Sequence, residues 1–152
     1  MYIKFTAVFL VVVILTGCDL QNLRPTNNDL SEFIEVEKRA NIAYQKEDWA
    51  TAEKEYLQLT QQVPAQSEPW FRLGNVYART NRLDAAVSTY KEALKRDPGN
   101  SKIWHNLGIV QLRQATSTFI QVVNLTEEDD PLNSRGKQVV NSVTELLSSG
   151  FE

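Results

Sequence analysis

The sequence predicts an all-α fold built from repeated pairs of helices, and three observations carry that prediction. Strong helix formers, chiefly Ala, Leu, Glu, Gln and Lys, dominate from Asn28 onward. Apolar residues in this part recur at helical spacing, and similar residues recur 34 positions apart, as in repeat proteins. With 152 residues, 42% of them hydrophobic and 23% charged, the chain has the composition of one globular domain.

Charge and cysteine content exclude several classes of function. The formal net charge is -3, so the chain lacks the basic excess with which nucleic-acid-binding proteins attract phosphates. The single cysteine, Cys18, excludes an intramolecular disulfide and a zinc site made of several thiolates. We therefore expect neither a nucleic-acid partner nor a thiolate metal site.

Residues 1–17 are predicted to be a cleaved secretory signal peptide. Lys4 provides an early positive charge, and residues 5–15 are apolar apart from Thr6. This apolar run is too short for a membrane-spanning helix, which needs about twenty residues, but it suits the hydrophobic region of a signal peptide. The segment is therefore expected to direct export and to take no part in the fold.

A lipid anchor is predicted directly behind this segment. Leu15, Thr16, Gly17 and Cys18 resemble the lipobox of bacterial lipoproteins, in which Leu, a small residue and Gly or Ala precede an invariant Cys. The resemblance implies that the Cys18 thiol receives diacylglycerol, that cleavage falls just before Cys18, and that the new amino terminus is acylated. A protein with these acyl chains is expected to be labelled by radioactive palmitate. Several acyl chains make a stable anchor, whereas one is marginal. A chance cysteine behind a plain signal peptide and a short uncleaved anchor are the alternatives.

The residues after the cysteine indicate which membrane holds the protein and how far the folded part can lie from it. In enteric bacteria the lipoprotein sorting rule reads Asp at this position as retention in the inner membrane, so Asp19 favours that membrane and the outer membrane is the alternative. In both cases the protein would face the periplasm. Residues 18–28 contain Pro25 and show no apolar periodicity, so we predict a tether. Ten extended residues reach at most about 33 Å, which keeps the folded part close to the bilayer.

The middle of the chain, residues 67–100, forms a complete 34-residue unit. The residues Trp70, Leu73 and Gly74 recur 34 positions later as Trp104, Leu107 and Gly108. This unit resembles the tetratricopeptide repeat (TPR) at eight signature positions: Trp70, Leu73, Gly74, Tyr77, Ala86, Tyr90, Ala93 and Pro98. The small Gly74 and Ala86 let the two helices of a repeat approach closely, and Pro98 ends the second helix.

The units on either side are less regular. The first, residues 33–66, departs from the pattern at two positions, as terminal repeats do because one of their faces meets water. The third is partial, residues 101–124: it has no Gly or Pro where its two helices should be joined, at residues 114–117, and its apolar residues keep helical spacing throughout. We therefore predict one long helix over residues 102–124 in place of a helix pair.

A last helix is predicted over residues 131–148. Asp130 is a capping residue, and Pro131 suits the first turn. An apolar stripe that includes Val143 and Leu147 would cover the exposed end of the stack. The family resemblance then implies that residues 29–148 form a short right-handed solenoid of about two and a half repeats with a C-terminal capping helix. The six predicted helices cover residues 29–46, 49–62, 68–80, 83–96, 102–124 and 131–148.

The sequence contains no constellation of residues typical of an enzyme. The only histidine, His105, has no nucleophilic neighbour, and there is no phosphate-binding loop, paired metal-ligand motif or nucleophile elbow. The acidic run at residues 127–130 lacks the spaced oxygen ligands of a calcium loop and is interpreted as favourable charge before a helix N-terminus. We expect no catalytic activity, no metal and no cofactor.

Function is then expected from a surface. In the tetratricopeptide family the first helices of successive repeats line a concave groove that binds protein segments. Asn41 and Asn75 repeat in register, and their amides suit an extended peptide backbone. Arg79 and Arg113 also repeat in register and suit a carboxylate. The residues expected in the groove are Asn41, Tyr44, Phe71, Asn75, Arg79, Lys102, His105, Ile109 and Arg113.

The partner is predicted only by class. Some family members clamp a C-terminal carboxylate, but Glu37, Arg72 and Asn106 replace three members of that residue set here, so this mode is not expected. The sequence predicts a lipid-anchored adaptor or assembly factor of the bacterial cell envelope, and it resembles lipoproteins that serve pilus, secretion or polysaccharide export machinery. A regulator of a peptidoglycan enzyme is the alternative.

Overall fold

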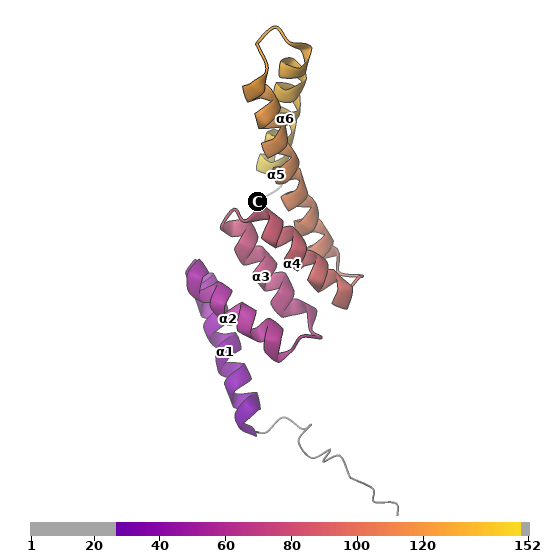
Figure 1. The fold of residues 1–152 in the computed structure, drawn as a ribbon. Coiled ribbons are helices and arrows are strands. Elements are labelled where there is room, and N and C mark those ends of the chain that lie inside the picture. The colour runs from indigo at the N-terminus through magenta and orange to yellow at the C-terminus, as the bar shows by residue number, and fades with distance from the viewer. Residues whose placement is uncertain (1–26, 150–152) are drawn as a thin grey trace, which may run out of the picture.

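The computed structural model describes residues 27–149, which form six α-helices joined by short turns (Figure 1). The helices are α1 (Asn27–Gln45), α2 (Trp49–Gln62), α3 (Ser67–Arg79), α4 (Leu83–Arg96), α5 (Ser101–Leu125) and α6 (Pro131–Ser149). Each helix packs against the next one along the chain, and α3 also contacts α5. Every predicted helix is confirmed within two residues at both ends, including the single long α5.

The predicted signal peptide and the predicted lipidation site, Cys18, lie outside the described residues. The predicted tether, residues 18–28, lies mostly outside them as well. Its last two residues differ from the prediction, because α1 begins at Asn27. The helical domain is therefore slightly longer than expected.

Side-chain caps and two unusual backbone positions define where helices begin and end. Asp48, Asn100 and Asp130 each accept a backbone N–H of the following turn through Oδ1, at 3.2, 3.2 and 2.7 Å. This satisfies donors that a helix N-terminus leaves unpaired, and it confirms the predicted cap before α6. Glu47 and Asn81, which are 34 positions apart, both have a φ of 58° and turn the chain between paired helices.

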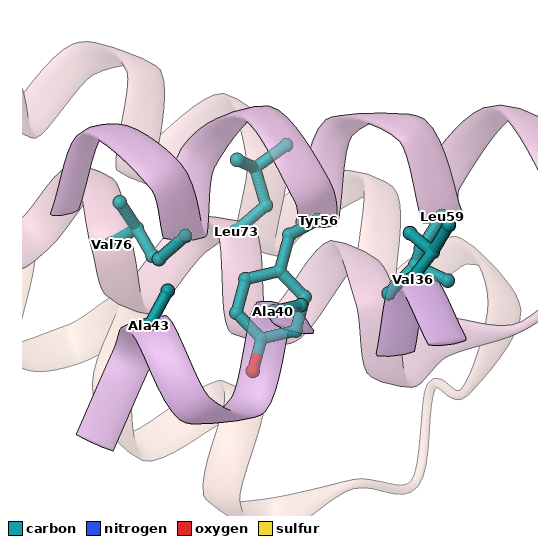
Figure 2. Close-up of a cluster of buried hydrophobic side chains, with 8 residues drawn as sticks. Val36, Ala40, Ala43, Tyr56, Leu59, Leu73 and Val76 are labelled. Carbon is teal, nitrogen blue, oxygen red and sulfur yellow. The ribbon is translucent and has the colours of Figure 1, made fainter. Parts of the chain in front are cut away.

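Two clusters of buried side chains hold the helix pairs together. The first lies between α1, α2 and α3 (Figure 2) and contains Val36, Ala40, Ala43, Ala52, Tyr56, Leu59, Leu73 and Val76. The second lies between α4 and α5 and contains Ala86, Tyr90, Ala93, Leu94, Ile103, Leu107 and Val110. Alanines bring the helix backbones close, and one fully buried tyrosine in each cluster fills the remaining space.

Beyond the stack, α5 continues and forms a hairpin with α6 (Figure 1). Asn133 of α6 is only 3% exposed, and its Nδ2 donates to the carbonyl oxygens of Val123 and Thr126, both at 3.0 Å. These bonds satisfy carbonyls that the end of α5 would leave unpaired. Val143 and Leu147 of the predicted apolar stripe are half-buried in this hairpin.

The end of the stack is covered differently from the prediction. Because α5 carries the chain far beyond the stack before it turns, α6 begins against the second half of α5. On the first half, Trp104 is 55% exposed, and a Cβ on Gly108 would meet no described atom within 4 Å other than its chain neighbours and the nearby backbone of α5. Within the described residues, α6 thus caps the extension of α5 and leaves the Trp104 face open.

Candidate functional site

A pocket of about 680 Å³ lies between α1, α3, α4 and α5 and the last turns of α6. Its volume lies within the range of about 300–1,000 Å³ that is common for ligand pockets. Most of its lining comes from the first helices of the repeats, α1, α3 and α5. Five of the predicted groove residues line it: Tyr44, Asn75, Arg79, Ile109 and Arg113.

The other four predicted residues lie elsewhere. Asn41 lines a smaller crevice of about 120 Å³ between α1, α2 and α3. Phe71 packs against the second core cluster, with its ring centroid 6.1 Å from that of Tyr90. Lys102 and His105 are exposed on the first turns of α5 and line neither cavity.

The two groove asparagines are bonded to the buried tyrosines of the second helices. The Tyr56 hydroxyl donates to Asn41 Oδ1, and the Tyr90 hydroxyl donates to Asn75 Oδ1, both at 2.8 Å. Burial raises the pKa of Tyr56 to about 12 and also raises the pKa of Tyr90. Both hydroxyls therefore stay protonated donors, and each asparagine joins the two helices of its repeat.

A third asparagine extends this network into the next repeat. Asn106 Nδ2 donates to Asn75 Oδ1 at 2.8 Å, so the Asn75 oxygen accepts two hydrogen bonds. An amide oxygen has two lone pairs. Asn75 can therefore offer a ligand its Nδ2 donor, which makes no hydrogen bond to the described residues.

The two groove arginines have different surroundings. Arg113 Nη1 donates to the carbonyl oxygen of Ala78 at 3.0 Å, and its Nη2 donates to Asn81 Oδ1 at 3.1 Å. Arg113 thus ties α5 to the end of α3. Arg79 is exposed, and it makes no hydrogen bond or ion pair with any residue that the structure describes. Among the described lining residues, Arg79 alone presents a guanidinium without a partner to the pocket.

Apolar side chains complete the pocket. The Tyr44 ring stands edge-on to Trp49 and Tyr56, with centroids 5.4 and 6.2 Å apart, so its position is well supported. Ile109 of α5 and Leu147 of α6 line the same space. The pocket therefore combines an apolar surface with the donors of Asn75 and Arg79.

Four of the lining residues were not predicted from the sequence: Tyr90, Asn106, Val110 and Leu147. A signal for Tyr90 was present, because it follows Asn75 by the same 15 residues that separate Asn41 from Tyr56. The position of Leu147 has no such signal, since it depends on how α6 crosses α5. Sequence periodicity shows which face of α6 is apolar, but it does not show which other helices the end of that face lies against.

Residues 27–149 contain neither a cluster of metal ligands nor a membrane-spanning helix. No group of three or more His, Cys, Asp or Glu in this part is arranged to hold a metal ion. None of the helices described there is long and apolar enough to cross a membrane. In the acidic run at residues 127–130, Glu128 approaches Lys137 at 3.6 Å and Asp130 caps α6. The run therefore has contacts within the hairpin.

The helix pairs match models of a known repeat family. Models of the tetratricopeptide repeat match residues 37–101 and residues 89–118. The protein contains tetratricopeptide repeats. The matches extend from α1 into α5 and stop short of α6. The repeat models do not extend beyond residue 118, and this is the part of the chain where α5 continues past the repeats and forms a hairpin with α6.

One relative shows the same repeat similarity. Over 101 residues the chain is 29% identical to the general transcriptional corepressor ssn6 of the fission yeast Schizosaccharomyces pombe. The match covers 62% of this chain but only 9% of the corepressor. The likeness is therefore that of one repeat segment to a small part of a much longer protein.

Proposed function

We propose that the protein is a lipid-anchored, non-catalytic adaptor that holds a protein partner beside a membrane of the bacterial envelope. Tetratricopeptide repeats bind protein partners, and the repeats here extend over residues 37–118. The observation that carries the proposal is the pocket between the repeats and α6, where apolar side chains adjoin unused hydrogen-bond donors. Its lining holds no Ser, Cys, His, Asp or Glu, which supports binding without catalysis.

Support for the anchor comes from the sequence. Leu15, Thr16, Gly17 and Cys18 match the lipobox pattern, and they follow a hydrophobic segment of signal-peptide length. Between Cys18 and the start of α1 at Asn27 the chain advances nine residues, which span at most about 30 Å. The pocket would then lie within reach of proteins embedded in or bound to the same membrane, such as components of pilus, secretion or polysaccharide export machinery.

Site-specific crosslinking in native membranes tests this function. A photo-crosslinking amino acid at Ile109 in the pocket should yield a discrete crosslinked protein, whereas the same amino acid at Lys91, an exposed position of α4 outside the pocket, should not. Replacing Cys18 by Ala should abolish labelling with radioactive palmitate and move the protein out of the membrane fraction. Persistent labelling would contradict the anchor, and equal crosslinking from both positions would contradict the pocket. Identification of the crosslinked protein would separate an assembly machine from a cell-wall enzyme.

A further inference from the structure

The charge of the pocket is opposite to that of the whole chain. The chain has 19 Asp and Glu against 16 Lys and Arg, but the pocket is lined by two arginines and by no carboxylate. The smaller crevice beside α1 has the reverse balance, since it is lined by Glu37, Glu68 and Arg72, and Arg72 is already bonded to Glu68 at 2.7 Å. An acidic ligand group is therefore attracted to the pocket and repelled from the crevice.

Within the pocket, Arg79 is the group available to an anion. Arg113 donates to Ala78 and Asn81 and cannot turn toward a ligand without losing both bonds. Arg79 has no such partner among the described residues and is exposed to an incoming group. A guanidinium presents paired N–H donors that match the two oxygens of a carboxylate. The charged contact of a ligand would thus form at the end of α3.

The surroundings of Arg79 add two further requirements. Tyr44, Ile109 and Leu147 line the same pocket and would exclude water from an apolar side chain placed between them. Asn75 has only its Nδ2 donor left, which suits a backbone carbonyl of an extended segment. A cavity of about 680 Å³ accommodates a few side chains but not a whole helix.

We propose that the pocket binds an extended segment of the partner protein in which an acidic residue stands beside a large apolar residue. The carboxylate binds Arg79, the apolar side chain fills the space between Tyr44, Ile109 and Leu147, and Asn75 holds the backbone. This inference rests on the proposed function and specifies the chemistry of its partner.

Peptide binding to the full-length protein, purified from membranes in detergent, tests the inference. The acidic probe is a fluorescein-labelled ten-residue peptide with Leu-Asp-Leu at its centre and Gly and Ser elsewhere, and the neutral probe has Asn in place of Asp. The wild-type protein should prefer the acidic probe at least about tenfold, as expected for a charge-assisted pair, and added salt should reduce the preference. Arg79→Glu should remove the preference.

A matched variant separates the pocket from net charge. Lys91→Glu changes the net charge by the same amount at an exposed site outside the pocket and should keep the preference. Thermal melting of both variants checks that the fold is intact, and Arg79→Lys should recover part of the preference. Equal binding of the two probes to wild type, or an unchanged preference in Arg79→Glu, would overturn the inference.

Two further results would show which part of the proposal is wrong if the probes do not bind as expected. The chain's own Phe151 and Glu152 have the proposed chemistry, so the probes are also tested on the double variant Phe151→Ser, Glu152→Gln. Binding that occurs only in this variant would show that the chain itself fills the pocket, and the partner proposal would be overturned. If neither probe binds but Ile109 still crosslinks to a protein in membranes, the adaptor function stands and the acidic segment is wrong.

Discussion

The ring of Tyr90 lies directly against Gly74, with Cδ1 and Cε1 both 2.6 Å from the place that a Cβ on Gly74 would occupy. Tyr90 is 1% exposed and its hydroxyl is bonded to Asn75, so the ring cannot move aside. Gly108 occupies the equivalent place in the third repeat, where a Cβ would meet no described atom within 4 Å apart from its chain neighbours and the nearby backbone of its own helix. The first glycine is therefore required by packing, and the second is not.

Substitution of these two glycines by alanine should have opposite effects. In Gly74→Ala the overpacked core should lose about 1–3 kcal/mol, which outweighs the gain of about 1 kcal/mol that alanine brings to a helix. In Gly108→Ala only the gain remains, so stability should rise by about 0.5–1 kcal/mol. Urea unfolding of the two variants measures both effects, and a Gly108→Ala variant as unstable as Gly74→Ala would refute this account.

Asn75→Ala should destabilise the fold more than Asn41→Ala does. Loss of Asn75 leaves the buried Tyr90 hydroxyl and Asn106 Nδ2 without their acceptor, at a cost of about 1–3 kcal/mol. Asn41 is exposed, so water can replace it as the acceptor for Tyr56. A double-mutant cycle with Tyr90→Phe should show positive coupling, and additive effects would contradict the shared bond. Binding studies should accordingly change Arg79 and leave Asn75 intact.

Arg96→Lys should destabilise the middle of the stack. The Arg96 guanidinium lies 4.3 Å from the centroid of the Trp70 ring, and its Nε donates to the carbonyl oxygen of Pro64. Lysine keeps the charge but loses the planar stacking, so about 0.5–2 kcal/mol should be lost. The matched control is Arg135→Lys, at an exposed position of α6, which should leave the thermal midpoint unchanged. An equal response of the two variants would exclude a special role for Arg96.

The ion pair between Glu53 and Arg82 should make the free energy of unfolding depend on pH in the acidic range. Arg82 Nη1 donates to Glu53 Oε1 at 2.8 Å, and hydrogen bonding by Arg82 lowers the pKa of Glu53 below its ordinary value. Because the folded-state pKa is the lower one, the pair stabilises the fold above about pH 4.3, the ordinary Glu pKa, and loses this effect as the pH falls through the folded-state pKa. Glu53→Gln should thus be less stable than wild type at pH 7, with the gap closing as the pH falls through the lowered folded-state pKa of Glu53. A gap that is independent of pH would show that the pair contributes nothing through charge.

Glu47→Asn should stabilise the turn between α1 and α2. Glu47 has a φ of 58°, a left-handed conformation that costs a side chain such as Glu about 1 kcal/mol and that Asn adopts more readily. Asn81 already holds the equivalent position one repeat later with the same φ. The expected gain is about 0.5–1 kcal/mol in urea unfolding. The neighbouring Lys46→Asn, at a residue without positive φ, should bring no gain.

The helices were predictable in part because the starts of α2, α5 and α6 have a local cause. Asp48, Asn100 and Asp130 are capping residues in the sequence, and each one caps a helix in the structure. The long α5 was predictable for the complementary reason, since residues 114–117 contain nothing that would end a helix. Local propensity and periodicity were sufficient for these features.

The candidate site was predictable only in part because its properties depend on pairs of distant side chains. Register predicted that Asn75, Arg79 and Arg113 lie on one side of the repeats, and all three line the pocket in the structure. Register could not show that a tyrosine 15 residues later takes the Asn75 oxygen, or that Arg113 is bonded to the end of α3. The position of Leu147 at the pocket depends on the angle at which α6 crosses α5, and a single sequence does not specify that angle.

The length of α5 has a mechanical consequence. At about 1.5 Å per residue, its 25 residues form a rod of roughly 37 Å, with no glycine or proline between Gly108 and its end at Leu125. The first half of the rod forms one wall of the pocket, and its far end holds α6 through Asn133. A force applied to the distant acidic turn, which joins α5 and α6, would therefore act on the pocket through both helices. It would change the distance between Ile109 of α5 and Leu147 of α6, which both line the pocket.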